Sequence, residues 1–216
     1  QYLFASKGQT TVALNLGGIA NISILNSDGQ VTGFDTGPAN TLMDQWIKKQ
    51  RNKNYDQDGQ WAADGNVNQS LLDQLLQEPW LQMPPPKSTG PELFNLRWLS
   101  QHIDETNMPA QDVQRTLCEF TAVTISQAIE KYAADATELI TCGGGAHNLF
   151  LRQRLATLLP QLQHSTSGDY GISPDWVESA MMAWLADRAL KQLPGNIPAV
   201  TGASHEVVLG TVYQAP

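Results

Sequence analysis

The feature that most constrains the fold is a run of three short apolar segments separated by tight turns near the start of the chain. Residues 11–16 stop at Gly17-Gly18, and residues 21–25 meet the turn Asn26-Ser-Asp-Gly29. Residues 31–34 then form a third segment. Turns this short join neighbouring antiparallel strands, and Asp-Gly between apolar runs is a strong hairpin signal. The sequence therefore predicts a three-stranded antiparallel meander.

Helical periodicity follows the meander. Residues 40–50 and 111–132 each place apolar side chains on one face, and a short buried strand is expected at 138–142. Asn148 is a suitable cap for the next helix, which is followed by a strand candidate at 161–166. A last helix is expected from Ser173 and Pro174 to the Leu193-Pro-Gly195 stop, with a buried face made of Val177, Met181, Trp184 and Leu185. The order of elements predicts an α/β fold with a mixed sheet flanked by helices.

Residues 51–110 differ in character from the rest of the chain. Asn, Gln, Asp, Gly and Pro dominate there, and short helices are expected only at 68–77 and 91–103. Asp56, Asp58 and Asp64 do not have the spacing of an EF-hand, so they are interpreted as residues of a solvated loop. We interpret the segment as an insertion that reaches over a cleft, not as a separate domain.

Three glycine-rich turns carry the chemical signal. They are Asn15-Leu-Gly-Gly-Ile-Ala-Asn21, Gly33-Phe-Asp-Thr-Gly-Pro-Ala-Asn40 and Thr141-Cys-Gly-Gly-Gly-Ala-His-Asn148. Glycine lets backbone amides approach an anion closely, and such turns can cradle phosphate. Asp35 stands where a strand would deliver a carboxylate to a cleft, so it can orient and deprotonate a nucleophile. Together these features predict phosphoryl transfer.

The order of these turns resembles that of the anhydro-N-acetylmuramic acid kinases, which belong to the acetate and sugar kinase, heat-shock protein and actin superfamily. The resemblance continues through Pro85-Pro-Lys-Ser-Thr-Gly90, Val177-Glu-Ser-Ala180 and Leu193-Pro-Gly-Asn196, and it spans almost the whole chain. It implies a ribonuclease-H-like lobe of an actin-like ATPase-fold sugar kinase. Residues 1–216 would form the C-terminal lobe with an insertion at about 51–110. The Gly-Thr-Ser-rich first phosphate loop of the family's N-terminal lobe has no counterpart here, so that lobe is expected as a missing partner.

The resemblance also implies a reaction. Family members use ATP and Mg²⁺ to open 1,6-anhydro-N-acetylmuramic acid with water and to phosphorylate O6, giving N-acetylmuramic acid 6-phosphate and ADP in peptidoglycan sugar recycling. Asp35 would be the general base that activates the water. The alternative for this residue is structural, because an Asx turn could make Asp35 the cap of the helix that begins near Ala39.

The remaining site residues follow from the same resemblance. The expected contacts to the nucleotide come from the second phosphate turn, the Asp35 turn and an adenosine turn: Gly17, Gly18, Asn21, Gly37, Asn40, Gly143, Gly144 and Gly145. The expected contacts to the sugar come from Lys87, Ser88, Thr89 and Glu178. Each has a structural alternative: a tight strand connection for Gly17-Gly18, an exposed loop for residues 87–89 and favourable placement at a helix start for Glu178. Relatives often have glycine where this chain has Ala39, which would be strained if that position required a positive φ. His147 is either a stacking partner for the base or simply solvated.

Two other functions stay open at this point. One is a superfamily sugar kinase that acts on an ordinary hydroxyl, and the other is a non-catalytic sugar- or nucleotide-sensing module. Supplying the anhydro sugar and the open sugar separately would distinguish a kinase of the first kind from an anhydro-sugar kinase. A ligand response that survives loss of Asp35 would indicate a sensing module.

Composition excludes several classes of protein. The formal net charge of -8 argues against a nucleic-acid surface, although a local amide cradle can still bind ATP. The two cysteines, Cys118 and Cys142, form neither a metal-type spacing nor a disulfide framework, which fits a cytoplasmic protein with no metal ligands of its own. No apolar run is long enough to cross a bilayer, so no membrane partner is expected. A homodimer is left open.

Overall fold

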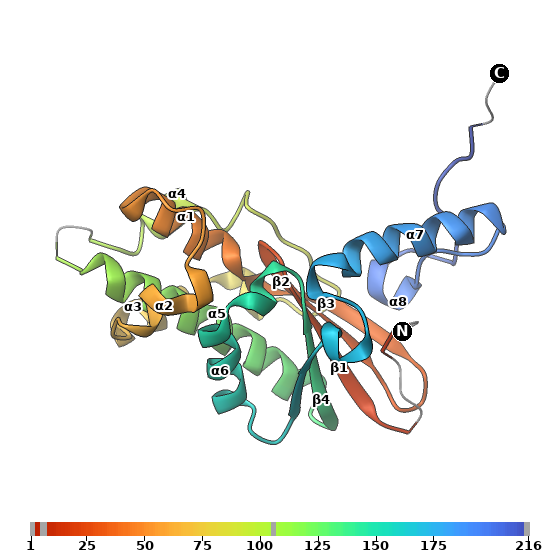
Figure 1. The fold of residues 1–216 in the computed structure, drawn as a ribbon, viewed down its shortest axis with the longest axis horizontal. Coiled ribbons are helices and arrows are strands. Elements are labelled where there is room, and N and C mark those ends of the chain that lie inside the picture. Colours follow the sequence, from red (N-terminus) through yellow and green to blue (C-terminus); the bar gives the residue numbers. More distant parts are fainter. Residues whose placement is uncertain (1–2, 5–7, 105–106, 214–216) are drawn as a thin grey trace.

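A five-stranded sheet in the order β3-β2-β1-β4-β5 forms the centre of the fold (Figure 1). The computed structural model describes residues 3–4, 8–104 and 107–213. The strands are β1 Thr10–Leu16, β2 Ile19–Leu25, β3 Val31–Pro38, β4 Ala136–Cys142 and β5 Gln163–Thr166. β1, β2 and β3 pair antiparallel, whereas β4 pairs parallel to both β1 and β5. The expected meander and the mixed sheet of a ribonuclease-H-like lobe are both confirmed.

Strand β3 is longer than the sequence pattern predicts. Its pairing with β2 continues through Asn21↔Asp35 and Ala20↔Gly37 to Ile19↔Pro38, with an irregularity between Ala20 and Asn21. Asp35 therefore lies inside the strand and not at its end. A pattern of alternating apolar residues cannot detect this continuation, because the pairing runs on through a segment of glycine and proline.

Helices cover one face of the sheet. They are α1 Asn40–Arg51, the long α5 Ala110–Tyr132 and α6 Leu149–Leu158, and all three lie close to their expected bounds. Alternate residues of β1 and β2 point into this layer, where Leu14 and Ile22 are buried in the same apolar cluster as Trp46 and Phe120. The opposite face of the meander is therefore the side on which the half-buried polar residues of these strands lie.

The insertion packs as a layer of short helices beside α1 and α5 (Figure 1). Its elements are η1 Gln57–Gly59, α2 Gln60–Ala63, α3 Gln69–Leu75, η2 Pro79–Gln82 and α4 Leu96–Leu99. The helix expected at 91–103 is thus only one short turn of α-helix. The interpretation of Asp56 as a solvated loop residue is wrong: it is 9% exposed, and its carboxylate accepts hydrogen bonds from the amides of Trp61 and Ala62, each at 2.9 Å.

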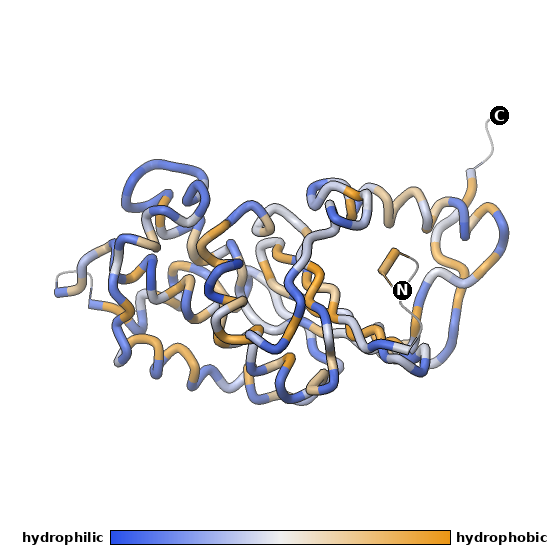
Figure 2. The backbone as a smooth tube through the Cα atoms, turned by 60° about the horizontal axis from the view of Figure 1, so that its bottom comes forward, coloured by the Kyte–Doolittle hydropathy of each residue, from blue (hydrophilic) through white to orange (hydrophobic). Residues whose placement is uncertain are grey.

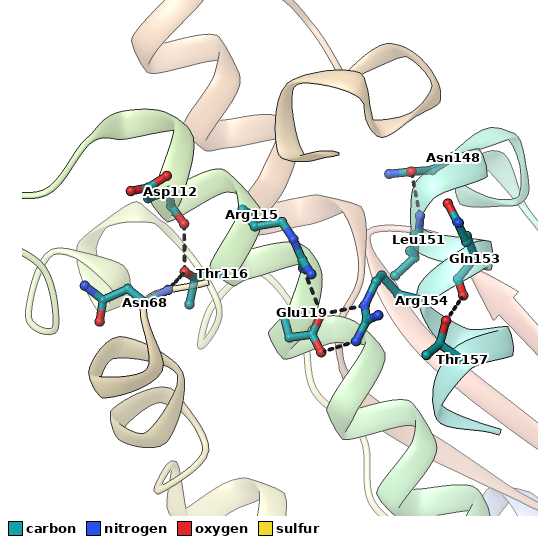
Figure 3. A network of polar contacts seen from close by, with 10 residues as sticks. All are labelled: Asn68, Asp112, Arg115, Thr116, Glu119, Asn148, Leu151, Gln153, Arg154 and Thr157. Atoms are coloured by element: carbon teal, nitrogen blue, oxygen red, sulfur yellow. Dashed lines mark hydrogen bonds and ion pairs between the residues drawn. The ribbon is translucent and has the colours of Figure 1, made fainter. Parts of the chain in front are cut away.

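A polar network fastens the insertion and α6 to α5 (Figure 3). The amide of Asn68 donates to Thr116 Oγ1 at 2.9 Å. Glu119 on α5 accepts from Arg115 Nη1 at 2.8 Å and from Arg154 Nε and Nη2 at 2.9 Å each. Burial alone would raise the pKa of Glu119, but the hydrogen bonds from Arg154 and Arg115 outweigh it and hold the pKa below its usual value.

The last part of the chain departs most from expectation. A loop after β5 carries η4 Ser167–Tyr170 and η5 Pro174–Trp176, and α7 Val177–Leu190 and α8 Pro198–Thr201 follow. The expected buried face of α7 is wrong: Met181 is 50% exposed, Val177, Trp184 and Leu185 are only half-buried, and Ala189 is the one buried residue of this helix. Figure 2 shows the apolar colouring along this exposed helix. The apolar periodicity of this segment correctly predicted a helix. It does not show whether other residues cover the apolar side of that helix. None of the helices in the described ranges is long and apolar enough to cross a membrane.

Candidate active site

A row of polar side chains crosses the sheet on the face opposite α1, α5 and α6, where α8 packs against β3. Register pairs Asp35 on β3 with Asn21 on β2, Asn21 with Asn15 on β1, and Asn15 with Cys142 on β4. Asp35, Asn21 and Asn15 are all half-buried. Neighbouring strands lie about 4.8 Å apart, so the row spans roughly 14 Å from the carboxylate to the strand that leads into Gly143. The row thus links the expected base to the expected adenosine turn.

The Gly17-Gly18 turn sits between Asn15 and Asn21 and is tied to the start of α1. The Gly18 carbonyl accepts from the amides of Ala39 and Thr41, and the Gly17 carbonyl accepts from the amide of Asn40. The side chain of Asn40 donates to the carbonyls of Leu16 and Gly17 at 3.0 and 2.8 Å. Asn40 therefore fixes the turn by binding its carbonyl oxygens. The backbone amides of the turn are then the groups available to an anion.

Packing does not explain the two glycines of this turn. A Cβ on Gly17 would meet nothing closer than the Ile19 carbonyl oxygen at 3.5 Å, and one on Gly18 would meet Thr41 Cβ at 3.8 Å. Both are ordinary contacts. A close approach of a ligand to the backbone gives these positions a reason to be glycine that the fold itself does not supply.

Asp35 contacts the insertion and not the helix that follows it. Its Oδ2 accepts hydrogen bonds from Ser88 Oγ and from the Thr89 amide, each at 2.9 Å. Helix α1 has no side-chain cap hydrogen bond, so the interpretation of Asp35 as a helix cap is wrong. Ala39 has φ −106° and carries none of the strain that a positive φ would impose.

Gly37 is glycine for a reason internal to the fold. Its φ is +146°, and a Cβ there would lie 3.3 Å from Thr124 Oγ1 and 3.4 Å from Leu81 Cδ2. It therefore lies where α5 and the insertion meet β3. Its predicted contact to the nucleotide stays a prediction.

The three glycines after β4 have different surroundings. A Cβ on Gly143 would collide with Asn15 Oδ1, and Gly143 also has φ +80°. A Cβ on Gly145 would collide with Leu16, at 2.7 Å from its Cβ and 2.9 Å from its carbonyl oxygen. A Cβ on Gly144 would meet no atom within 4 Å. Two of the three glycines therefore allow the turn to pack against β1, and Gly144 is the one that faces open space where a purine could lie.

The 3-10 helix η5, directly before α7, closes the other side of this turn. The Gly143 amide donates to the Pro174 carbonyl at 3.1 Å, and His147 Nε2 lies 2.9 Å from Asp175 Oδ1. His147 is thus paired with a carboxylate, although both side chains are more than half exposed. Burial raises the pKa of Cys142 to about 11, and the charge of Glu178 contributes to the shift.

Lys87 is held by the insertion itself. Its Nζ donates to the Leu81 carbonyl at 2.8 Å and lies 4.3 Å from the centre of the Trp80 ring. Burial lowers the pKa of Lys87, with a further contribution from Lys131 and an opposing one from Asp35. The ammonium group anchors the loop in this structure, and its predicted contact to the sugar stays a prediction, as do those of Ser88, Thr89 and Glu178.

Sequence reasoning missed two residues of the site, Asn15 and Asp175. Asn15 had a readable signal, because a hairpin centred on Gly17-Gly18 must pair it with Asn21. Asp175 had none, since its pairing with His147 depends on the loop path after β5. Within the described residues, no three Cys, His, Asp or Glu side chains converge into a metal-binding group.

The sheet order and the glycine turns after β1 and β4 define the class of protein: this is a ribonuclease-H-like lobe of the actin-like ATPase fold. The family model for anhydro-N-acetylmuramic acid kinase matches residues 1–215. Curated proteins of that name are similar to this chain, with 50% identity over 214 residues in Vibrio vulnificus, 49% over 215 residues in Pasteurella multocida and 46% over 214 residues in Pseudomonas savastanoi. The chain belongs to the anhydro-N-acetylmuramic acid kinase family.

Each of these matches covers 99% of this chain but only 57–59% of the relative. Among solved structures, the chain is similar to an activator of 2-hydroxyisocaproyl-CoA dehydratase from Clostridium difficile with bound ADPNP, with a TM-score of 0.47 and 13% identity over 85% of this chain and 64% of that one. Component A of (R)-2-hydroxyglutaryl-CoA dehydratase from Acidaminococcus fermentans has a TM-score of 0.45 and 14% identity over 80% of this chain and 62% of that one.

Proposed function

We propose that this chain forms the C-terminal lobe of an ATP-dependent kinase that opens 1,6-anhydro-N-acetylmuramic acid with water and phosphorylates O6. The products are N-acetylmuramic acid 6-phosphate and ADP, and the role is the recycling of peptidoglycan sugars. The observation that carries the proposal is the polar row from Asp35 to Gly143, because it joins a carboxylate to both glycine turns in a member of this family.

The row gives the substrates an order. The nucleotide would lie along β2, β1 and β4, with adenosine at Gly144 and the phosphates at Gly17-Gly18. In this arrangement the transferable phosphate would lie nearest to β3 and Asp35. The sugar would then lie beside Asp35, on the side where the insertion contacts β3 through Ser88 and Thr89. Positioning of this kind supplies much of the rate in phosphoryl transfer.

Asp35 takes the role of general base. A water molecule attacks the anomeric carbon of the sugar and gives its proton to the Asp35 carboxylate, while the bond between that carbon and O6 breaks. O6 then bonds to the γ-phosphorus of ATP, and ADP leaves with the electron pair of the broken phosphoanhydride bond. The amides of Gly17 and Gly18 would bind the charge on the phosphates.

ATP and Mg²⁺ are the proposed cofactors. The carboxylates of this lobe fit a Mg²⁺ ion that arrives bound to the nucleotide, because Mg²⁺ is commonly held by phosphates, water and only one or two carboxylates. The described residues form no metal cluster of their own, and Asp35 is the acidic side chain next to the phosphate turn. When bound, the ion would neutralise the phosphate charge.

We further propose that the length found in the relatives but not matched here forms a second lobe, and that the exposed apolar face of α7 packs against it. Met181 and Met182 are neighbours on this helix and are 50% and 62% exposed, and an exposed apolar patch can mark an interface. The cytoplasm is the proposed location, since ATP is available there and the cysteines Cys118 and Cys142 are free.

The decisive experiment compares substrates. Purified full-length protein is given ATP with either the anhydro sugar or the open N-acetylmuramic acid, in water enriched in ¹⁸O. The proposal predicts phosphorylation of the anhydro sugar with ¹⁸O on the anomeric carbon of the product. Phosphorylation of the open sugar alone would identify a kinase that acts on an ordinary hydroxyl. Ligand binding without ADP formation would identify a sensing module.

A further inference from the structure

The segment Lys87-Ser88-Thr89, here called the strap, holds Asp35 from the side of the insertion. Besides the two hydrogen bonds to Oδ2, the Asp35 amide donates to the Lys87 carbonyl at 3.1 Å. The strap therefore contacts both the backbone and the side chain of this residue. Within the described part of the chain, Asp35 Oδ1 accepts no hydrogen bond, so the two carboxylate oxygens are not equivalent.

The strap is itself anchored at several points. Lys87 Nζ donates to the Leu81 carbonyl, and Trp80 Nε1 donates to the Ser88 carbonyl at 3.2 Å. Trp80 in turn packs edge-on against the buried ring of Phe94. The position of the strap is thus set by the packed part of the insertion, although the Ser88 side chain is exposed.

We infer that Ser88 and the Thr89 amide are positioning groups for the catalytic carboxylate. By engaging Oδ2, they orient Asp35 so that Oδ1 is the atom that accepts the proton of the attacking water. A hydrogen bond to an ionised group holds its geometry more firmly than one between neutral groups. Ser88 acts through Asp35 in this account and not through contact with the sugar. The inference rests on the proposed function and gives the insertion a part in the chemistry.

Kinetics on the full-length protein separate the two candidate roles of Ser88, which are positioning of Asp35 and direct contact with the sugar. Ser88→Ala should lower kcat by about tenfold or more, because a hydrogen bond to a charged group is lost, and should leave the KM of the sugar nearly unchanged. Ser88→Thr keeps a hydroxyl and should restore most of kcat. In an Asp35→Asn background, Ser88→Ala should cost little more, because the group that it positions is already inactive. A raised KM with normal kcat, or losses that multiply with those of Asp35→Asn, would overturn the inference.

Ser100→Ala is the matched control. Ser100 lies in the same insertion and donates to the Arg97 carbonyl at 2.8 Å, away from Asp35. It should leave kcat and KM unchanged. If Ser100→Ala lowered kcat as much as Ser88→Ala does, the effect would be a general one of removing a serine from the insertion. That result would also overturn the inference.

A second measurement needs no activity. In the NMR spectrum of the backbone amides of the full-length protein, Asp35→Ala should move the resonance of the Thr89 amide proton upfield. The reason is that this proton loses its hydrogen bond to the Asp35 carboxylate. Ser100→Ala should not move it. An unchanged Thr89 resonance in Asp35→Ala would exclude the contact in solution. If the protein fails to act on the anhydro sugar but the Thr89 resonance moves as expected, the proposed function fails and the contact stands.

Discussion

Glycines at the candidate site divide by what surrounds them. Gly37, Gly143 and Gly145 are required by close contacts within the lobe, whereas Gly17, Gly18 and Gly144 have room for a side chain. We propose that contact with a ligand accounts for the second group. This division comes from the structure, because the sequence shows only that glycines are present.

Gly144→Val tests the adenosine turn. The new side chain would meet no protein atom near its Cβ, so the fold should tolerate it. It should nevertheless weaken ATP binding in the full-length protein by roughly tenfold or more, the usual steric cost of filling an occupied space. Binding of the sugar, measured separately by calorimetry, should stay near its original affinity.

Gly145→Ala provides the contrast. Its Cβ would collide with the Leu16 backbone, so it should lower the stability of the fold before it affects any one ligand. Equal loss of ATP and sugar affinity in Gly144→Val would show that this variant also misfolds, and would remove the adenosine assignment.

At the scale of the elements, much of the lobe could be predicted from sequence. The hairpin turns and the apolar periodicity gave the meander, α1 and α5 nearly to their bounds. Three things could not be predicted: the continuation of β3 past Asp35, the burial of Asp56 and the exposure of α7. Each depends on contacts that the spacing of apolar residues does not reveal, such as the pairing of β3 with β2 and the hydrogen bonds from Trp61 and Ala62 to Asp56. The contact between Ser88 and Asp35 belongs to the same class, because it joins residues 53 positions apart.

Asp44 on α1 makes the stability of the lobe depend on pH. Burial, helped by the charge of Asp56, raises the pKa of Asp44 from 3.8 to about 6. Folding therefore favours the protonated form. The resulting stability is complete below about pH 4 and is lost as the pH rises through about 6.

Asp44→Asn mimics the protonated side chain. It should stabilise the full-length protein at pH 7.5 by an amount on the order of 1–3 kcal/mol and should have little effect at pH 4, as measured by urea unfolding. Asp73→Asn, at an exposed position on α3, is the control and should change the free energy of unfolding little. A stabilisation that is the same at both pH values would contradict this account of Asp44.

Glu119 has the opposite dependence. Its pKa is held low by Arg154 and Arg115, so its contribution to stability is present above about pH 4.5 and is lost as the pH falls through the folded-state pKa. Glu119→Gln leaves two mostly buried guanidinium groups without a charged partner. We expect a loss of about 1–3 kcal/mol in the free energy of unfolding at pH 7, with a smaller loss in acid. Glu130→Gln, exposed on the same helix, is the control; an equal loss there would refute the role of the network.

At the scale of the whole molecule, we propose that this lobe forms one wall of a cleft. The polar row, the Gly17-Gly18 turn and Gly144 all lie on this lobe, while the relatives are longer by about two fifths of their length. We expect residues 1–216 alone to show negligible kinase activity even when folded, because transfer of a phosphoryl group needs the substrates enclosed from both sides. An assay of ADP release with the anhydro sugar checks this expectation, with the full-length protein as control. Robust turnover by the 216-residue chain would contradict the two-lobe account.

The most direct test of the central claim is the steady-state kinetics of Asp35→Asn in the full-length protein. Asparagine keeps the shape of the side chain and can still accept from Ser88 and Thr89, but it cannot take a proton from water. Loss of a general base predicts a fall in kcat of roughly 10²–10⁴, with the KM values of ATP and the anhydro sugar changed little. A purified, folded Asp35→Asn variant with near-wild-type kcat would contradict the claim and remove Asp35 from the mechanism.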